Sequence, residues 1–259
     1  MATARIHVDL PLVVGATLTL PEAASHHLLR VLRLERGAAL TLFNGEGGEF
    51  AARLLGVNGR LAQVELVAQR ATSTESPLFS HYGLAISKGE RMEIALQKLT
   101  ELGVSRITPL LTARCEVRLG AERWERKRQH WQQVVISACE QSGRTRIPAI
   151  APPCALETFA AQAEGDLKLF MHWQGRALPS GQQPRRLVLV SGPEGGLTEA
   201  EADCLERAGF LRVTVGPRIL RTETAPLTLL SLGQWLWGDL DGGAASPTRN
   251  SPGSPEPPG

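Results

Sequence analysis

A change of hydrophobic pattern near residue 75 constrains this chain most strongly. After the polar segment 72–77, short apolar runs typical of buried strands alternate with stretches of helical periodicity. Strands that alternate with helices favour a parallel sheet, because each helix returns the chain to the same end of the sheet. We therefore expect an α/β domain over residues 78–240, built on a mostly parallel sheet.

The pattern within this domain is specific enough to place its elements. Strands are expected at 83–87, 104–111, 147–150, 167–171, 187–190 and 211–215. Helices are expected from 87 to 103, from 121 to 142, from 198 to 209 and from 224 to 237. The segments 87–90 and 198–201 have the spacing of capping boxes, in which a hydroxyl and a carboxylate bond the first free amides of a helix.

Residues 1–72 have a different character and predict a small β domain. Strand candidates lie at 12–14, 17–20, 39–43, 49–55 and 61–67, and the segment 25–33 is helix-like. Glycine-rich turns at 44–48 and 58–59 separate the last three strands and favour hairpins in a small barrel or sandwich. Residues 241–259 are rich in Pro, Gly and Ser, which predicts a disordered tail.

Composition excludes several classes of protein. No apolar run has the length of a membrane span and the first residues lack a signal-peptide pattern, so we expect a cytoplasmic protein without a membrane role. The four cysteines lack metal-ligand spacing, so no metal site is expected. The net charge is only +2, yet residues 114–146 carry eight basic side chains against four acidic ones. Arginine greatly outnumbers lysine, which could reflect either phosphate recognition by guanidinium groups or simply the composition of the genome.

Two loops carry the strongest chemical signal. The segment 191–196 follows one expected strand and 216–225 follows another, and ligands of α/β sheets bind at the carboxyl ends of strands. Glycines let a backbone approach a ligand closely, while the fingerprints of triphosphate and dinucleotide sites are missing. The loops therefore suit a largely uncharged planar group such as adenine. The alternative is that both are simply tight turns between strands and helices.

These loops, together with segments 27–33, 88–104 and 138–144, resemble the ribosomal RNA small-subunit methyltransferase E family of the SPOUT, or trefoil-knot, class. The resemblance implies a PUA-like RNA-binding β-barrel over residues 1–72 and a deep trefoil knot in the C-terminal domain. It also implies S-adenosyl-L-methionine as cofactor, N3 of one uridine in the 16S rRNA of the small ribosomal subunit as target, and a homodimer. Val215 and Pro226 depart from the pattern of the family, where leucine and a small helix former are expected.

The resemblance and the loop chemistry together assign roles to individual residues. The expected cofactor-binding residues are Gly192, Pro193, Glu194, Gly195, Gly196, Val215, Gly216, Ile219, Leu220, Thr222, Thr224 and Ala225. Removal of the N3 proton of uridine calls for a base and for a cation that stabilises the uracil anion. Arg221 is the candidate cation and Glu223 the candidate base, with Glu194 as a weaker alternative. Glu223 could instead be a carboxylate that is favoured at the start of a helix.

Five arginines are candidates for binding RNA phosphates, although each could equally be a solvated or ion-paired side chain: Arg30, Arg33, Arg114, Arg144 and Arg146. Two other functions stay open at this point. One is a methyltransferase of the same class that acts on another nucleotide or on a ribose 2′-hydroxyl. The other is a non-catalytic RNA-binding assembly factor. The missing dinucleotide fingerprint disfavours an oxidoreductase.

Overall fold

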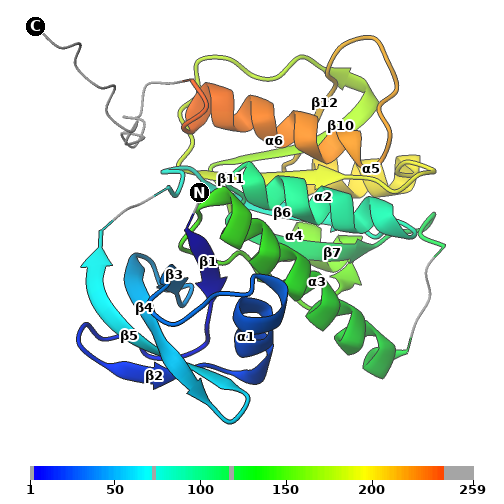
Figure 1. The fold of residues 1–259 in the computed structure, drawn as a ribbon. Helices are drawn as coiled ribbons and strands as arrows, with labels where there is room; N and C mark the ends of the chain where they lie inside the picture. Colours follow the sequence, from blue (N-terminus) through cyan, green and yellow to red (C-terminus); the bar gives the residue numbers. More distant parts are fainter. Residues whose placement is uncertain (1–2, 72–73, 117–119, 242–259) are drawn as a thin grey trace, which may run out of the picture.

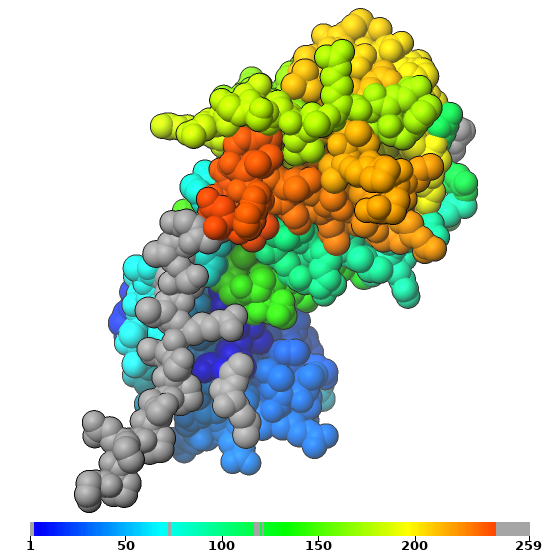
Figure 2. Space-filling view, turned by 90° about the horizontal axis from the view of Figure 1, so that it is seen from above, coloured from blue at the N-terminus to red at the C-terminus, as the bar shows by residue number. Residues whose placement is uncertain are grey.

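The computed structural model describes residues 3–71, 74–116 and 120–241, which form a small β domain and a larger α/β domain. The two domains are separate lobes that meet along one side, with the β domain at one end of the molecule and α5 at the other (Figures 1 and 2). The predicted disordered tail lies, apart from residue 241, outside the described residues.

The N-terminal domain is a five-stranded sheet in the order β1-β3-β4-β5-β2. Its strands are β1 (Ala4–His7), β2 (Thr17–Thr19), β3 (Ala39–Phe43), β4 (Glu49–Asn58) and β5 (Leu61–Arg70). The helix α1 (Glu22–His26) continues into a π-helical turn, η1 (His27–Val31), and packs its buried residues on the same core as the strands. The predicted turn at 44–48 joins β3 to β4 as an antiparallel hairpin.

The sequence pattern was wrong at two places in this domain. Residues 12–14 do not form a strand; Val13 and Val14 lie exposed in a loop. The sheet begins instead with the edge strand β1, which pairs in parallel with β3 and which the polar first residues hid. Two adjacent valines favour a strand only when a neighbouring strand gives them a surface to pack on.

The C-terminal domain contains a sheet of seven parallel strands. Six follow the order β12-β10-β11-β6-β7-β8, and β9 also pairs with β7. The strands are β6 (Phe79–Ala85), β7 (Arg106–Leu111), β8 (Ala149–Ile150), β9 (Cys154–Ala155), β10 (Leu167–Arg176), β11 (Arg186–Ser191) and β12 (Leu211–Val213). The predicted parallel α/β architecture is confirmed.

Helices cover both faces of this sheet (Figure 1). One face packs against α2 (Glu90–Glu101), α3 (Ala121–Ser142) and α6 (Thr224–Trp237), and the other against α4 (Leu156–Gln162) and α5 (Glu199–Arg207). The bounds predicted for α3 and α6 are confirmed. The short α4 was not predicted, because seven residues between prolines and a strand leave too few turns for a helical period to show.

One of the two predicted capping boxes forms. Thr198 accepts a hydrogen bond from the amide of Glu201, whose carboxylate accepts one from the amide of Thr198. The box predicted at residues 87–90 is wrong, because α2 begins after Gly89 without a side-chain cap. The Ser87 hydroxyl lies instead 3.0 Å from that of Thr222, far along the chain. A local signal was therefore overridden by a tertiary contact.

The two domains are joined by Phe43 of β3, which is buried in the hydrophobic core of the C-terminal domain, and by a set of polar contacts. The Arg5 guanidinium of β1 donates hydrogen bonds to the carbonyl oxygens of Cys139 and Arg144, at 2.7 and 2.9 Å. The amide of His7 donates to the Glu140 carboxylate at 2.9 Å. Because these bonds run from β1 to the last turn of α3 and the residues just after it, the β domain is fixed against the carboxyl end of α3.

Candidate functional site

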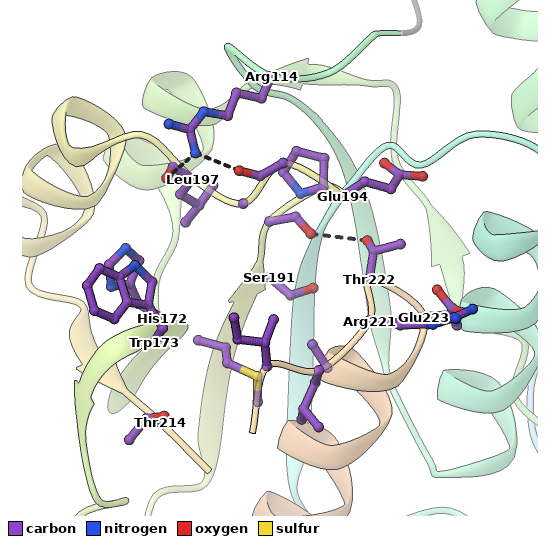
Figure 3. A pocket seen from close by; sticks show the side chains of 18 of the residues that line it. Arg114, His172, Trp173, Ser191, Glu194, Leu197, Thr214, Arg221, Thr222 and Glu223 are labelled. Atoms are coloured by element: carbon purple, nitrogen blue, oxygen red, sulfur yellow. Dashed lines mark hydrogen bonds between the residues drawn. The ribbon is translucent and has the colours of Figure 1, made fainter. Parts of the chain in front are cut away.

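The two glycine-bearing loops meet at the carboxyl ends of β10, β11 and β12, where they enclose a cavity of about 540 Å³ (Figure 3). One loop joins β11 to α5 and the other joins β12 to α6. Their meeting confirms that they share one site, because parallel strands bring their carboxyl ends to the same edge of the sheet. The volume lies within the range of small-molecule sites, roughly 300–1,000 Å³.

Most of the residues expected to bind a ligand line this cavity. The first loop contributes Gly192, Pro193, Glu194, Gly195 and Gly196, and the second contributes Val215, Ile219, Leu220, Arg221, Thr222, Glu223 and Ala225. Two expected residues are not among the lining residues. Gly216 forms the turn into the second loop with a φ of 66°, and Thr224 is the first residue of α6.

A chain of hydroxyl groups fixes the two loops to each other. Thr222 donates a hydrogen bond of 3.2 Å to the carbonyl oxygen of Gly192, and its side chain is labelled in Figure 3. Its oxygen also lies 3.0 Å from the Ser87 hydroxyl, just after the end of β6. Gly192 has little room beside it, since a Cβ there would lie 3.0 Å from the amide nitrogen of Leu197. The first loop is therefore packed tightly against its own next turn.

Arg114 braces the first loop from the outside. Its guanidinium donates to the carbonyl oxygens of Gly195 and Leu197, at 2.5 and 3.4 Å. The preceding amide, that of Ala113, donates to the buried Glu201 carboxylate of the capping box at 2.7 Å. Arg114 was expected to face RNA phosphates, and the structure adds a second role in holding the backbone of the loop.

The acidic residues of the site share one cation that sequence reasoning missed. Arg91 of α2 lies 3.1 Å from the Glu194 carboxylate and 4.0 Å from that of Glu223. Partial burial opposes the charge of Glu194, but hydrogen bonds from backbone amides and from Arg91 outweigh it and lower the pKa of this carboxyl. Within the described residues, the buried Oε2 atom of Glu223 accepts no hydrogen bond.

The third wall of the cavity comes from β10 and was also missed. Met171, His172 and Trp173 line the cavity together with the two loops, and Trp173 is 70% exposed. Figure 3 shows the rings of His172 and Trp173. Burial lowers the pKa of His172, and the charge of Arg212 adds to this effect, so the imidazole is neutral at neutral pH. Residues 167–171 were expected to be a strand, so the rule about carboxyl ends could have pointed to this wall.

The described part of the chain contains neither a candidate metal site nor a helix that could span a membrane. No cluster of His, Cys, Asp and Glu side chains there could hold a metal ion. None of the helices in the described ranges combines the length and the apolar character needed to cross a bilayer.

The structure contradicts the expectation that Arg144 binds an RNA phosphate. Its side chain is 6% exposed and lies 2.6 Å from the Glu75 carboxylate, and it also donates to the carbonyl oxygens of Thr100 and Val104. A guanidinium with these partners has no donor face left for a phosphate. Sequence reasoning could not see this, because Glu75 lies about seventy residues away in the chain.

The other arginines stay candidates. Arg30 of η1 and Arg33, which follows it with a φ of 52°, are exposed on the β domain. Arg146 is exposed at the junction of the domains, where its guanidinium lies beside Gly47 and its amide donates to Glu75.

The chain is similar to known RNA methyltransferases. Residues 74–234 match the model of an RNA methyltransferase domain and residues 20–67 that of an RNA methyltransferase PUA domain. Ribosomal RNA small subunit methyltransferase E of Buchnera aphidicola (Schizaphis graminum strain) is 30% identical over 91% of this chain and 97% of its own length. The protein of that name from Bacillus subtilis is 30% identical over 80% of this chain and 85% of its own.

Two solved structures extend the similarity to the whole fold. A protein from Legionella pneumophila described as a methyltransferase, in complex with the bound cofactor SAM, is 41% identical, with a TM-score of 0.89 over 93% of this chain and 100% of its own. Ribosomal RNA small subunit methyltransferase E of Neisseria gonorrhoeae, bound to S-adenosyl methionine, is 39% identical, with a TM-score of 0.87 over 92% of this chain and 100% of its own.

The buried ion pair predicts a large effect on stability. We expect Arg144→Ala to lower the free energy of unfolding by about 3–5 kcal/mol, because it leaves the Glu75 carboxylate buried without this guanidinium. Urea denaturation followed by circular dichroism measures this change. The matched control is Arg123→Ala on the exposed face of α3, which should change it by less than about 0.5 kcal/mol. Equal effects of the two variants would contradict the structural role of Arg144.

Proposed function

The chain belongs to the ribosomal RNA small subunit methyltransferase E family, and we propose that it transfers a methyl group from S-adenosylmethionine to N3 of a uridine in 16S rRNA. The observation that carries this proposal is the cavity between the two loops, where a buried carboxylate oxygen of Glu223 is left without a hydrogen-bond donor among the described residues. A pocket that is apolar apart from a few placed charges suits both an adenine ring and the removal of one proton.

The residues of the cavity fit the cofactor. The loop backbones and the side chains of Val215 and Leu220 offer apolar walls and amide groups to an uncharged ring. The positive φ of Gly196, 69°, permits a turn of the first loop that a residue with a Cβ would strain. When bound, S-adenosylmethionine supplies an electrophilic methyl group on a positively charged sulfur.

We assign Glu223 as the base that accepts the N3 proton of the target uridine. Its Oε2 atom accepts no hydrogen bond within the described residues and has the Arg91 guanidinium only at 4.0 Å, whereas Glu194 is held by Arg91 at 3.1 Å and by the amide of Lys88 at 3.2 Å. Arg221 lines the same cavity, with an exposed side chain that can approach the uracil anion. Arg91 then acts as a positioning residue that holds both carboxylates.

The path of the chain supports the proposed trefoil knot. β12 is the edge strand of the sheet, yet the following helix α6 packs against β11 and α2 near its centre. A Cβ on Gly233 of α6 would lie 2.8 Å from the Leu187 side chain of β11. The second loop therefore crosses the carboxyl ends of β10 and β11, where it meets the first loop.

The surface of α6 supports the proposed homodimer. Trp235 is 57% exposed and Leu236 49% exposed, side by side on this helix. Large exposed apolar side chains of this kind are typical of protein–protein contacts. Trp237, by contrast, packs against the core of its own domain. The two neighbouring tryptophans therefore differ in their surroundings, and only Trp235 is available to a second copy of the chain.

Analysis of rRNA tests the proposed reaction. We expect 16S rRNA from a strain that lacks the gene to lose one N3-methyluridine, which the gene supplied in trans restores. Mass spectrometry of nucleoside digests measures this loss. Loss of a different methylated nucleoside would move the target to another base or to a ribose hydroxyl. An unchanged set of methylated nucleosides would favour the non-catalytic assembly factor.

The left-handed glycine of the first loop predicts the effect on cofactor binding. Gly196→Val forces a β-branched residue to a φ of 69°, so we expect the affinity for S-adenosylmethionine, measured by calorimetry, to fall at least about tenfold. Gly59→Val is the matched control, because Gly59 has a φ of 64° in a hairpin of the β domain. If Gly196→Val binds like the wild type, the first loop does not form the cofactor site.

The assigned base predicts a loss of rate without a loss of binding. We expect Glu223→Gln to slow single-turnover methyl transfer by about 10²–10⁴-fold, while the affinity for S-adenosylmethionine changes by less than about twofold. Glu194→Gln is the control within the same site and should slow transfer much less, because its carboxylate is already engaged. A normal rate for Glu223→Gln would show that this residue is not the base.

A further inference from the structure

A second cavity lies at the other end of the same sheet and takes no part in the proposed reaction. It measures about 320 Å³ and lies at the amino ends of β6, β7 and β11, beneath the end of α4. The methyl-transfer site lies at the carboxyl ends, so each strand separates the two cavities by its own length. A volume near the lower limit for small-molecule sites suits one nucleotide unit.

The parallel register explains why polar side chains gather there. Phe79 is paired with Arg186 across β6 and β11, and His81 is paired with Arg106 across β6 and β7. Paired residues point to the same face of a sheet, and so do residues two apart along a strand. Phe79, His81, Arg106, Thr108 and Arg186 therefore share one face, and all five line the cavity.

Further along the strands the same face becomes apolar and is closed by α4. Phe159 of this helix lies so near the sheet that a Cβ on Gly83 would be 2.7 Å from its ring. Its ring also meets the His81 imidazole edge to face, with centroids 5.0 Å apart. The helix ends at Gln162, and beyond it the amino ends of the strands are left uncovered as a polar cavity with an aromatic wall.

The charge of this cavity is positive. Arg106 and Arg186 are both exposed, and within the described residues no carboxylate forms an ion pair with either guanidinium. Glu164 is the one acidic residue among those that line the cavity, so the lining residues carry an excess of one positive charge. The nearby Asp166 carboxylate does not line the cavity and accepts hydrogen bonds from the amides of Arg185 and Arg186. Guanidinium groups without an ion pair beside a cavity favour an anionic ligand, and their planar geometry matches phosphate oxygens.

The remaining titratable groups of the cavity are neutral. Burial, together with the charges of Arg106 and Arg186, lowers the pKa of His81 to about 4, and the imidazole lies 2.8 Å from the Thr108 hydroxyl. Burial raises the pKa of the Cys154 thiol. The floor of the cavity is thus an uncharged polar pair, and the positive charge is confined to its rim.

An aromatic ring stands beside one of the two cations. The Arg186 guanidinium lies over the Phe79 ring, with its central carbon 4.9 Å from the ring centroid, and Phe79 is 37% exposed. A stacked arginine and aromatic pair offers a planar surface to a base, while the outer edge of the guanidinium stays free for a phosphate.

We propose that this second cavity binds one nucleotide of the RNA substrate away from the methylated base, with its phosphate between Arg106 and Arg186 and its base against Phe79. The inference rests on the proposed function, because it takes RNA as the substrate. A phosphodiester brings one negative charge, which matches the excess of the cavity. The site would anchor the RNA without taking part in methyl transfer.

Binding and rate measurements on the full chain test this anchor. We expect the variant Arg106→Gln/Arg186→Gln to bind 16S rRNA transcript at least about tenfold more weakly. The slope of log affinity against log salt should fall by about one for each phosphate that the variant no longer binds. At saturating RNA its single-turnover rate, and its affinity for S-adenosylmethionine, should stay within about twofold of the wild type. Arg185→Gln is the matched control, because this exposed neighbour does not line the cavity and should leave RNA affinity unchanged.

Cys154 gives a direct measure of occupancy, because it lines the cavity. We expect the transcript to slow alkylation of Cys154 in the wild type but not in the double variant, as read by mass spectrometry of the Cys154 peptide. Unchanged RNA affinity of the double variant would overturn the proposal. Protection of Cys154 by uridine monophosphate, but not by RNA, would also overturn it and would assign the cavity to a free nucleotide. If the wild type transfers no methyl group, the proposed function fails, while the RNA affinities still decide this inference.

Discussion

The parallel direction of all seven strands in the C-terminal sheet is the constraint on which the rest of the structure depends. It makes the carboxyl ends and the amino ends of the strands chemically different. The loops that leave the carboxyl ends are rich in glycine and hydroxyl groups, and they fold back on one another around the larger cavity. The amino ends carry arginines and a neutral histidine around the smaller cavity. In an antiparallel sheet these groups would be mixed at both edges, and neither cavity would have a consistent chemistry.

The larger site depends on ion pairs between groups from distant parts of the chain. Arg91 comes from the first turn of α2, Glu194 from the loop after β11 and Glu223 from the start of α6. The Arg91 guanidinium lies 3.1 Å from the Glu194 carboxylate but 4.0 Å from that of Glu223, so it compensates the charge of Glu194 more strongly. This asymmetry separates two acidic residues that look alike in the sequence, because the Oε2 atom of Glu223 accepts no hydrogen bond within the described residues. The hydroxyl of Thr222 joins the two loops by donating a hydrogen bond to the carbonyl oxygen of Gly192.

The β domain is attached at a place that does not disturb the site. Its contacts are made with the carboxyl end of α3 and with the residues just after that helix, whereas the loops of the cavity lie toward the opposite end of the molecule (Figure 2). Arg144 occupies this junction, and its burial shows how a basic segment can contain both structural and exposed arginines. Its formal charge contributes to the positive segment 114–146 without being available at the surface.

The sequence by itself determined the parallel α/β architecture, the bounds of α3 and α6 and the meeting of the two loops, because each follows from a local period or from the rule that parallel strands end together. The tertiary structure alone decided the use of particular polar side chains. Ser87 was expected to cap a helix and instead meets Thr222, and Arg144 was expected at RNA and instead pairs with Glu75. The physical reason is the same in both cases. A polar side chain bonds to whichever partner the packing of the chain brings within hydrogen-bond distance. When that partner is about seventy or more residues away, the local sequence pattern does not reveal it.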